Sequence, residues 1–275
     1  MEPLIINLAP TGMVPTREQS HHLPLTVDEI AADCGRCVAL GVSMLHLHAR
    51  NIDGMPTTDP AIFGQLIAAV KEASGDAIIV ATTSGRCVQR IEQRASCLML
   101  DGTNKPEMAS LTLSSMNFKS EASINTPDAV IYLAKAMQER NIRPELEVFD
   151  LGMVNFAKIL IEKGLISPPF YFNILLGNPA SAQASLLHLG AIVADLPPQS
   201  VWSVGGIGRY QTPANALGLA VGRGVRTGLE DNLWLDSART TLASNSQLVA
   251  RVTAQAEALG RPLATPALVR SWLGL

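Results

Sequence analysis

Short apolar segments alternate with amphipathic helical segments along the whole chain, and no other feature constrains its fold so strongly. Eight segments rich in β-branched and large apolar residues are predicted to be strands. They are residues 4–8, 42–47 (the part after Gly41 of an apolar run over 39–47), 77–81, 107–113, 146–149, 170–176, 201–204 and 225–229. Strands without a polar face are buried on both sides, which is typical of a parallel sheet covered by crossover helices.

A helical pattern follows each of these segments. Thr26 and Glu29 form a capping box, and Asp59-Pro60 and Thr126-Pro127 are typical helix starts. The predicted helices are residues 26–40, 59–73, 88–95, 126–140, 153–163, 181–189, 213–221 and 244–259. Eight strand–helix units within residues 1–275 predict a single α/β domain, a (β/α)8 TIM barrel. A doubly wound open sheet is the alternative, but it requires a GxGxxG after the first strand, and the chain has none there.

The composition indicates a soluble protein that acts on small molecules. With 47% hydrophobic and 16% charged residues, the chain can bury a sizeable core. Its net charge is -3 and it has no basic block, so we expect no nucleic-acid partner. No apolar run approaches ~20 residues, which argues against a membrane span. The first residues lack the features of a signal peptide, so we expect a cytoplasmic location.

Four cysteines, Cys34, Cys37, Cys87 and Cys97, are too few for a disulfide framework in a chain of this length. Cys34 and Cys37 have the spacing of a redox motif, but they fall inside a predicted helix and not at a helix start after a strand. Burial as small apolar residues is the favoured interpretation, and a redox or metal role is the alternative.

Two histidines mark the end of the second predicted strand. His46 and His48 are two residues apart, so in a strand they point to the same face. Neutral imidazole is the commonest metal ligand, and two imidazoles supply half of a tetrahedral zinc shell. A pair of inert, hydrogen-bonded polar residues is the other interpretation. The spacing at the end of an apolar strand favours a metal site.

Glu230, at the end of the eighth strand, is the best-placed third ligand. In a closed barrel the eighth strand lies beside the first, and the second strand is the next one over. Glu230 can therefore reach His46 and His48 across the mouth of the barrel. A His2Glu shell leaves one position open, which is typical of catalytic zinc. A helix-capping or surface carboxylate is the alternative role for Glu230.

Further polar residues follow the strand ends, where barrel enzymes have their active sites. Arg226 shares a strand face with Glu230, and Asp231 is close enough to pair with Arg226 or to act as a base. A structural ion pair is an equally open interpretation of these two. The hydroxyl residues, which could bind a substrate carboxylate or carbonyl or simply cap strand ends, are Thr82, Thr83, Ser84, Ser110 and Thr112.

Two more features suggest ligand binding. Glu147 is expected to point inward, and a buried carboxylate needs a partner or a role. The loop with Gly206, Gly208 and Arg209 follows the seventh strand, where TIM barrels often bind phosphate. A tight turn explains these glycines nearly as well.

Taken together, these motifs closely resemble the β-keto acid cleavage enzymes, almost from end to end. The resemblance includes the segments 2–5, 11–12, 23–24, 46–48, 105–109, 144–148, 205–209, 228–232 and 260–266. The combination of His46-Leu47-His48 with Gly228-Leu229-Glu230-Asp231-Asn232 is its most specific part.

The resemblance implies a zinc-dependent barrel that uses acetyl-CoA as co-substrate. A β-keto acid and acetyl-CoA would give acetoacetate and a new acyl-CoA by Claisen and retro-Claisen steps. By resemblance, His46, His48 and Glu230 hold zinc, which polarises the ketone, and Asp231, oriented by Arg226, removes a proton. Thr82 stands where the family has Ser, and the family tends to form oligomers, so a homotetramer is expected.

Two departures concern specificity. A family enzyme that acts on a 5-amino-3-ketohexanoate has Glu where this chain has Val14, and Asn where it has Thr112. Val14 cannot pair with a substrate ammonium group, so that substrate is not expected to be preferred.

Two other functions remain as alternatives. A metal-dependent amide or ester hydrolase can use the same barrel and the same histidine pair, although such sites usually add histidines from later strands. A non-catalytic, zinc-stabilised subunit of an assembly is the third interpretation.

Overall fold

The computed structural model describes residues 1–275 and contains a closed barrel of parallel strands. The barrel strands are β1 (Ile5–Leu8), β2 (Met44–Leu47), β3 (Ile78–Ala81), β4 (Met108–Thr112), β7 (Arg143–Val148), β8 (Phe170–Leu176), β9 (Ser200–Gly206) and β10 (Gly224–Thr227). Around the ring the order is β1-β10-β9-β8-β7-β4-β3-β2. Spatial order follows chain order and β10 lies beside β1, so the predicted TIM barrel is confirmed.

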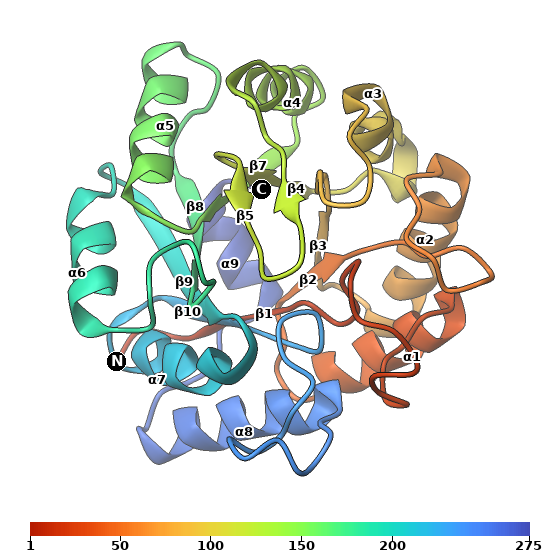
Figure 1. The fold of residues 1–275 in the computed structure, drawn as a ribbon, viewed down its shortest axis with the longest axis vertical. Helices are drawn as coiled ribbons and strands as arrows, with labels where there is room; N and C mark the ends of the chain where they lie inside the picture. Colours follow the sequence, from red (N-terminus) through yellow and green to blue (C-terminus); the bar gives the residue numbers. More distant parts are fainter.

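A ring of helices surrounds the strands (Figure 1). The helices are α1 (Val27–Val38), α2 (Pro60–Ser74), α3 (Ile91–Arg94), α4 (Pro127–Glu139), α5 (Leu151–Glu162), α6 (Leu186–Asp195), α7 (Gln211–Val221), α8 (Asn245–Ala258) and α9 (Pro266–Leu273). The capping box of Thr26 and Glu29 starts α1, and the side chain of Thr126 accepts a hydrogen bond from the backbone N–H of Ala129 at the start of α4. These helix starts are where the capping residues predict them.

The interior of the barrel changes character from one end to the other. At the amino-terminal end, apolar side chains such as Ile5 and Met44 pack against Leu273 of α9, which closes that end. In the middle, the phenol of Tyr171 donates to Ser203 at 2.9 Å, and Asn7 Nδ2 donates to Glu145 Oε1 at 2.6 Å. This buried polar layer supports the groups that lie above it at the carboxyl-terminal mouth.

Four local predictions were wrong or missed. The helix predicted at 181–189 begins only at Leu186, because Gln183 bonds back to the carbonyl of Asn178 and folds a loop there. The helix predicted at 88–95 is reduced to α3, followed by 3-10 turns at Ser96–Met99 and Gly102–Asn104. The sequence patterns did not predict helix α9 or the hairpin formed by β5 (Met116–Asn117) and β6 (Ala122–Ser123). Two of these segments are also held by distant groups: Arg140 donates to the carbonyl of Leu98 at 3.2 Å, and the backbone N–H of Ala182 donates to the carbonyl of Phe149 at 2.8 Å.

The cysteine pair lies in the body of α1, as its helical pattern predicts. Cys34 and Cys37 are both buried and free, and burial raises the pKa of the Cys37 thiol to about 12. A thiol with so high a pKa is a poor nucleophile near neutral pH.

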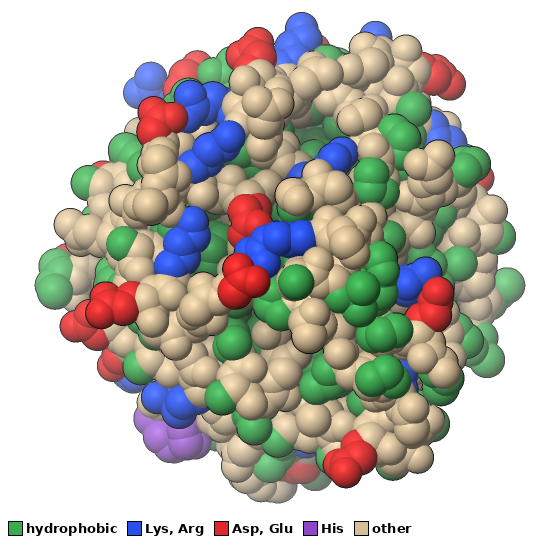
Figure 2. Space-filling view, turned by 180° about the vertical axis from the view of Figure 1, so that it is seen from behind, with side chains coloured by type: hydrophobic (Ala, Val, Ile, Leu, Met, Phe, Trp, Pro, Cys, Tyr) green, Lys and Arg blue, Asp and Glu red, His purple; other side chains and the backbone are tan.

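The face opposite to that of Figure 1 shows Lys, Arg, Asp and Glu side chains intermingled, with hydrophobic side chains scattered among them (Figure 2). No face of one charge sign covers this side. None of the helices combines the length and the apolar content that crossing a membrane requires.

Arg261 ties the C-terminal segment to the rest of the barrel. Its guanidinium is buried and donates to the carbonyls of Glu2 at 2.8 Å, Leu219 at 2.6 Å, Gly222 at 2.6 Å and Gly218 at 3.3 Å. These bonds join α7, α8 and the segment before β1. The guanidinium therefore fixes three parts of the chain at once.

We expect Arg261→Ala to lower the free energy of unfolding by about 2–4 kcal/mol, since buried carbonyls lose a charged donor. Urea-induced unfolding followed by circular dichroism measures the change. The control is Arg36→Ala, whose side chain is 61% exposed, and which should cost under ~1 kcal/mol. Equal midpoints for the two variants would show that Arg261 is not an anchor.

Candidate active site

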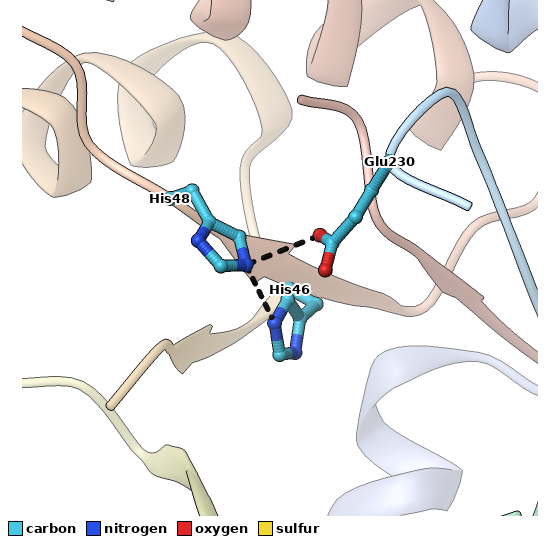
Figure 3. Close-up of side chains that lie close together, drawn as sticks. All are labelled: His46, His48 and Glu230. Carbon is cyan, nitrogen blue, oxygen red and sulfur yellow. Dashed lines mark hydrogen bonds and ion pairs between the residues drawn. The ribbon is translucent and has the colours of Figure 1, made fainter. Parts of the chain in front are cut away.

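The two histidines lie side by side at the mouth of the barrel. His46 is in β2 and His48 follows the end of this strand, and both side chains are almost fully buried. Their Nε2 atoms are 3.2 Å apart, and His48 Nε2 is also 3.2 Å from Glu230 Oε2 (Figure 3). The three side chains point toward one another from two different strands, as the predicted ligand set requires.

Two glycines allow Glu230 to reach the histidines. Gly228, just after β10, has a φ of +141°, and a Cβ atom there would lie 2.1 Å from the carbonyl oxygen of Ala9. Gly12 lies under the side chain of Glu230, because a Cβ atom at Gly12 would be 2.5 Å from Glu230 Cγ. Only glycine leaves room for this close crossing of the β10 and β1 ends.

The donor atoms fit a divalent metal ion. Glu230 Oε2 is buried without a hydrogen-bond partner, and the facing Nε2 atoms of His46 and His48 leave two lone pairs directed into one space. In a tetrahedral zinc shell with bonds of about 2.0–2.1 Å, neighbouring ligand atoms are ~3.3 Å apart. The two separations of 3.2 Å agree with this value. The residues present are therefore suited to hold zinc or a similar ion.

Glu145 stands behind His46 and was not assigned a role from the sequence. Its Oε2 is 2.6 Å from His46 Nδ1, and its Oε1 accepts from Asn7 at 2.6 Å and from Asn173 at 3.1 Å. Burial alone would raise the pKa of Glu145, but attraction to His46 and Arg226 outweighs it and the pKa is lowered. An ionised Glu145 directs the His46 proton to Nδ1 and leaves Nε2 free as a ligand atom.

His46, Glu145 and Glu147 also come close enough to form a second possible ligand group. Glu145 has both of its oxygens committed to Asn7, Asn173 and His46. The group with Glu230 instead offers an unpaired oxygen, so it is the better ion site. The spacing of Glu145 and Glu147, two residues apart on one strand, was the available signal that both point inward.

Arg226 is buried among three carboxylates. Its Nε lies 2.8 Å from Asp231 Oδ2, its Nη2 lies 2.7 Å from Glu230 Oε1, and its Nη1 lies 3.3 Å from Glu147 Oε1. The Arg226 side chain is 2% exposed. A guanidinium in this position offsets the mutual repulsion of the carboxylates and fixes their orientation.

The carboxylates differ in their affinity for protons. Burial alone would raise the pKa of Glu230, but attraction to His48, Arg226 and His46 places it well below the usual value. The pKa of Asp231 is instead raised, because burial outweighs the attraction of Arg226 and Glu230 adds repulsion. Glu230 is thus suited to remain an anionic ligand and Asp231 to accept a proton.

These groups line a cavity of about 310 Å³. From the residues singled out in the sequence, the cavity walls include His46, His48, Glu230, Arg226, Asp231, Glu147, Thr82, Ser84, Thr112 and Val14. The hydroxyl of Thr112 donates to Glu147 Oε2 at 2.6 Å, which orients this carboxylate.

Five other residues singled out in the sequence lie outside this lining. The hydroxyl of Thr83 donates to the carbonyl of Ser110 at 2.6 Å, and the hydroxyl of Ser110 accepts from the Thr83 backbone at 3.1 Å. These two join β3 to β4. Gly206 is the last residue of β9, and Gly208 and Arg209 lie in the 3-10 helix Gly208–Tyr210 between β9 and α7.

The β5–β6 hairpin contributes a part of the cavity that the sequence did not reveal. Its residues Phe118 and Lys119 line the cavity, together with Arg86 from the loop after β3. Arg86 pairs with Glu121 at 2.9 Å and lies 3.8 Å from the Phe118 ring centroid, so it fastens the hairpin tip. On the other side, Asn178 donates to the carbonyl of Asn117 at 3.0 Å. Figure 1 shows the hairpin across the barrel mouth.

Fold and site together define a TIM-barrel protein with a buried His2Glu centre beside an Arg–Asp pair. A profile of the beta-keto acid cleavage enzyme family matches residues 3–275. The chain belongs to this family.

Its relatives and structural neighbours agree. The 3-keto-5-aminohexanoate cleavage enzyme of Acetoanaerobium sticklandii is 37% identical over 100% of this chain and 99% of its own length. The 3-oxoadipate:acetyl-CoA acetyltransferase of Cupriavidus necator is 34% identical over 100% and 95%. The structure of ObcA in ternary complex with C4-CoA adduct and oxalate has a TM-score of 0.81 at 22% identity, covering 92% of this chain and 68% of ObcA. That likeness concerns the barrel fold.

We expect His46→Ala and Glu230→Ala to retain no metal, because each removes one of the three donors in the candidate ligand group. Elemental analysis of purified protein should fall from about one zinc per chain to under ~0.2. The matched control is Asp231→Asn, which changes a neighbouring carboxylate outside the ligand set and should retain its metal. Full occupancy in the Glu230→Ala protein would contradict the assignment.

Proposed function

We propose that this enzyme converts a β-keto acid and acetyl-CoA into acetoacetate and a new acyl-CoA, with zinc held by His46, His48 and Glu230. The relatives' names describe reactions of this kind, including 3-oxoadipate:acetyl-CoA acetyltransferase and 3,5-dioxohexanoate:acetyl-CoA acetone transferase. The single observation that carries the proposal is the placement of a His2Glu ligand group beside Arg226 and Asp231 in one cavity.

The reaction balances without an oxidant or reductant. The C–C bond between the acyl group and C2 of the keto acid breaks, and a C–C bond forms between C2 and the acetyl group. The sulfur of CoA leaves the acetyl group and joins the released acyl group. A bound divalent ion would supply Lewis-acid polarisation of the ketone of the keto acid.

The side chains of this site have complementary tasks in that reaction. Asp231 Oδ accepts the proton from C2, because the pKa of Asp231 is raised by burial whereas that of its neighbour Glu230 is lowered. Arg226 keeps the Asp231 carboxylate oriented through Nε and Nη2, at 2.8 and 3.2 Å. Thr82 lies in the cavity wall and can donate to a substrate oxygen. Phe118 and Lys119 of the hairpin line the cavity beside these groups and can contact the substrate.

The test is a mass-spectrometric screen of β-keto acids with acetyl-CoA, which reads out new acyl-CoA masses. The wild type should form acetoacetate and one new acyl-CoA in equal amounts. Asp231→Asn should lower kcat at least ~100-fold, the usual contribution of a general base, while retaining its zinc. A metal-dependent hydrolase would turn over substrate without CoA, and a structural subunit would show no turnover.

Val14 provides a separate prediction about the substrate side chain. It lines the cavity and is 40% exposed, and no carboxylate stands at this position. We expect kcat/KM for a 5-amino-3-ketohexanoate to be at least ~10-fold below that of the uncharged 3-ketohexanoate, because the ammonium group loses water without gaining an ion pair. The Val14→Glu variant should reverse this order, and a wild-type preference for the amino compound would refute the prediction.

A further inference from the structure

A second cavity, of about 320 Å³, lies next to the active site and contains an unusual group of cations. Arg209, from the 3-10 helix after β9, lines it together with Arg239 from the loop after β10 and Arg251 from helix α8. None of the three forms an ion pair with a carboxylate. Three unneutralised guanidinium groups around one hollow repel one another, and an anion between them would relieve that repulsion.

The three arginines are held in different ways. Arg251 is fixed, because Nη1 donates to Thr212 Oγ1 at 2.9 Å and Nη2 donates to the carbonyl of Leu235. Arg209 and Arg239 are exposed, and their side chains donate no hydrogen bond within the protein. The one carboxylate in the wall, Asp236, instead accepts from the backbone N–H groups of the loop that follows it. The cations therefore retain free donors.

Gly208 brings the backbone close to this cavity. It has a φ of +59°, and a Cβ atom there would be 3.4 Å from Arg239 Nη2. The start of helix α7 offers few free donors, because the backbone N–H of Gln211 donates to the carbonyl of Gly208 and Pro213 has no N–H. The guanidinium groups are therefore the donors here that are suited to bind phosphate.

The two cavities share a wall. Asp231 and Leu233 line the active-site cavity, whereas their neighbours Asn232 and Trp234 line the arginine cavity. The backbone N–H of Gly208 donates to the carbonyl of Asp231 at 2.7 Å, which joins the two loops. A long ligand with a reactive group at one end and phosphates at the other could occupy both cavities.

We propose that Arg209, Arg239 and Arg251 bind the phosphate groups of the nucleotide end of CoA while its thioester lies in the active-site cavity. This inference rests on the proposed function, in which acetyl-CoA is the co-substrate. CoA carries a diphosphate and a 3′-phosphate at one end and its sulfur at the other. Its phosphates would lie in the arginine cavity and its thioester in the active-site cavity. The bidentate geometry of guanidinium groups matches phosphate oxygens.

The test compares thioesters that differ only in their phosphates: acetyl-CoA, acetyl-dephospho-CoA and acetyl-pantetheine. The wild type should have a higher kcat/KM with acetyl-CoA than with acetyl-pantetheine. In the double variant Arg209→Gln/Arg239→Gln this ratio should fall about 10- to 100-fold, mainly because KM for acetyl-CoA rises. The control is Lys135→Gln on α4, which removes a positive charge from an exposed position across the barrel. An unchanged preference in the double variant would overturn the inference and leave the proposed function intact.

A binding measurement separates the inference from turnover. Isothermal titration with adenosine 3′,5′-bisphosphate should show weaker binding to the double variant than to the wild type and the Lys135→Gln control, even if no β-keto acid reacts. Equal binding by all three proteins would overturn the phosphate site. Inorganic phosphate is the second probe, and if it binds as tightly as the nucleotide, the assignment to the CoA nucleotide end is wrong.

Discussion

The contact of Arg226 with Asp231, Glu230 and Glu147 is the interaction on which the site depends. Four charged groups lie together, largely buried, at the mouth of the barrel, and the guanidinium is the one cation that faces all three carboxylates. Removing one partner of such a group leaves uncompensated buried charge, which costs several kcal/mol, of order 3–5. Arg226 lowers the pKa of both Glu230 and Asp231; their proton affinities differ because His48 lowers the pKa of Glu230 further, whereas burial and repulsion from Glu230 raise that of Asp231. Glu230 is therefore suited to hold a metal ion, and its neighbour Asp231, at the same strand end, is suited to accept a proton.

The barrel contributes rigidity that this charge arrangement requires. His46 lies on β2, and Glu145 reaches its ring from β7 across the interior, supported by Asn7 of β1. An imidazole fixed through Nδ1 presents Nε2 in one direction only. Three strands that are not all neighbours in the ring thus define the position of a single nitrogen atom. Gly228 completes the arrangement, since it lets the end of β10 pass close to Ala9 and carry Glu230 over the site.

The loops differ from the barrel in what they add. The β5–β6 hairpin limits access to the carboxyl-terminal mouth, and Arg86 and Asn178 hold it from opposite sides. The loops after β9 and β10 build the wall between the active-site cavity and the arginine cavity. These contacts could not be predicted from the sequence, because loop conformation depends on which distant segments meet it. The wrong helix at 181–189 has the same origin: the backbone N–H of Ala182 donates to the distant carbonyl of Phe149 at 2.8 Å, so this segment stays in the loop.

The sequence by itself determined the alternation of strands and helices, the closed barrel that follows from eight such units, and the pairing of His46 with His48 on one face. These features depend on local periodicity, which a strand of period two and a helix of period 3.6 impose on neighbouring residues. Tertiary structure alone decided that Glu145 stands behind His46, that Thr83 and Ser110 bond to each other, and that three arginines surround one cavity. The reason is physical: such contacts join residues far apart in the chain, and ring closure, side-chain direction and loop path set them together.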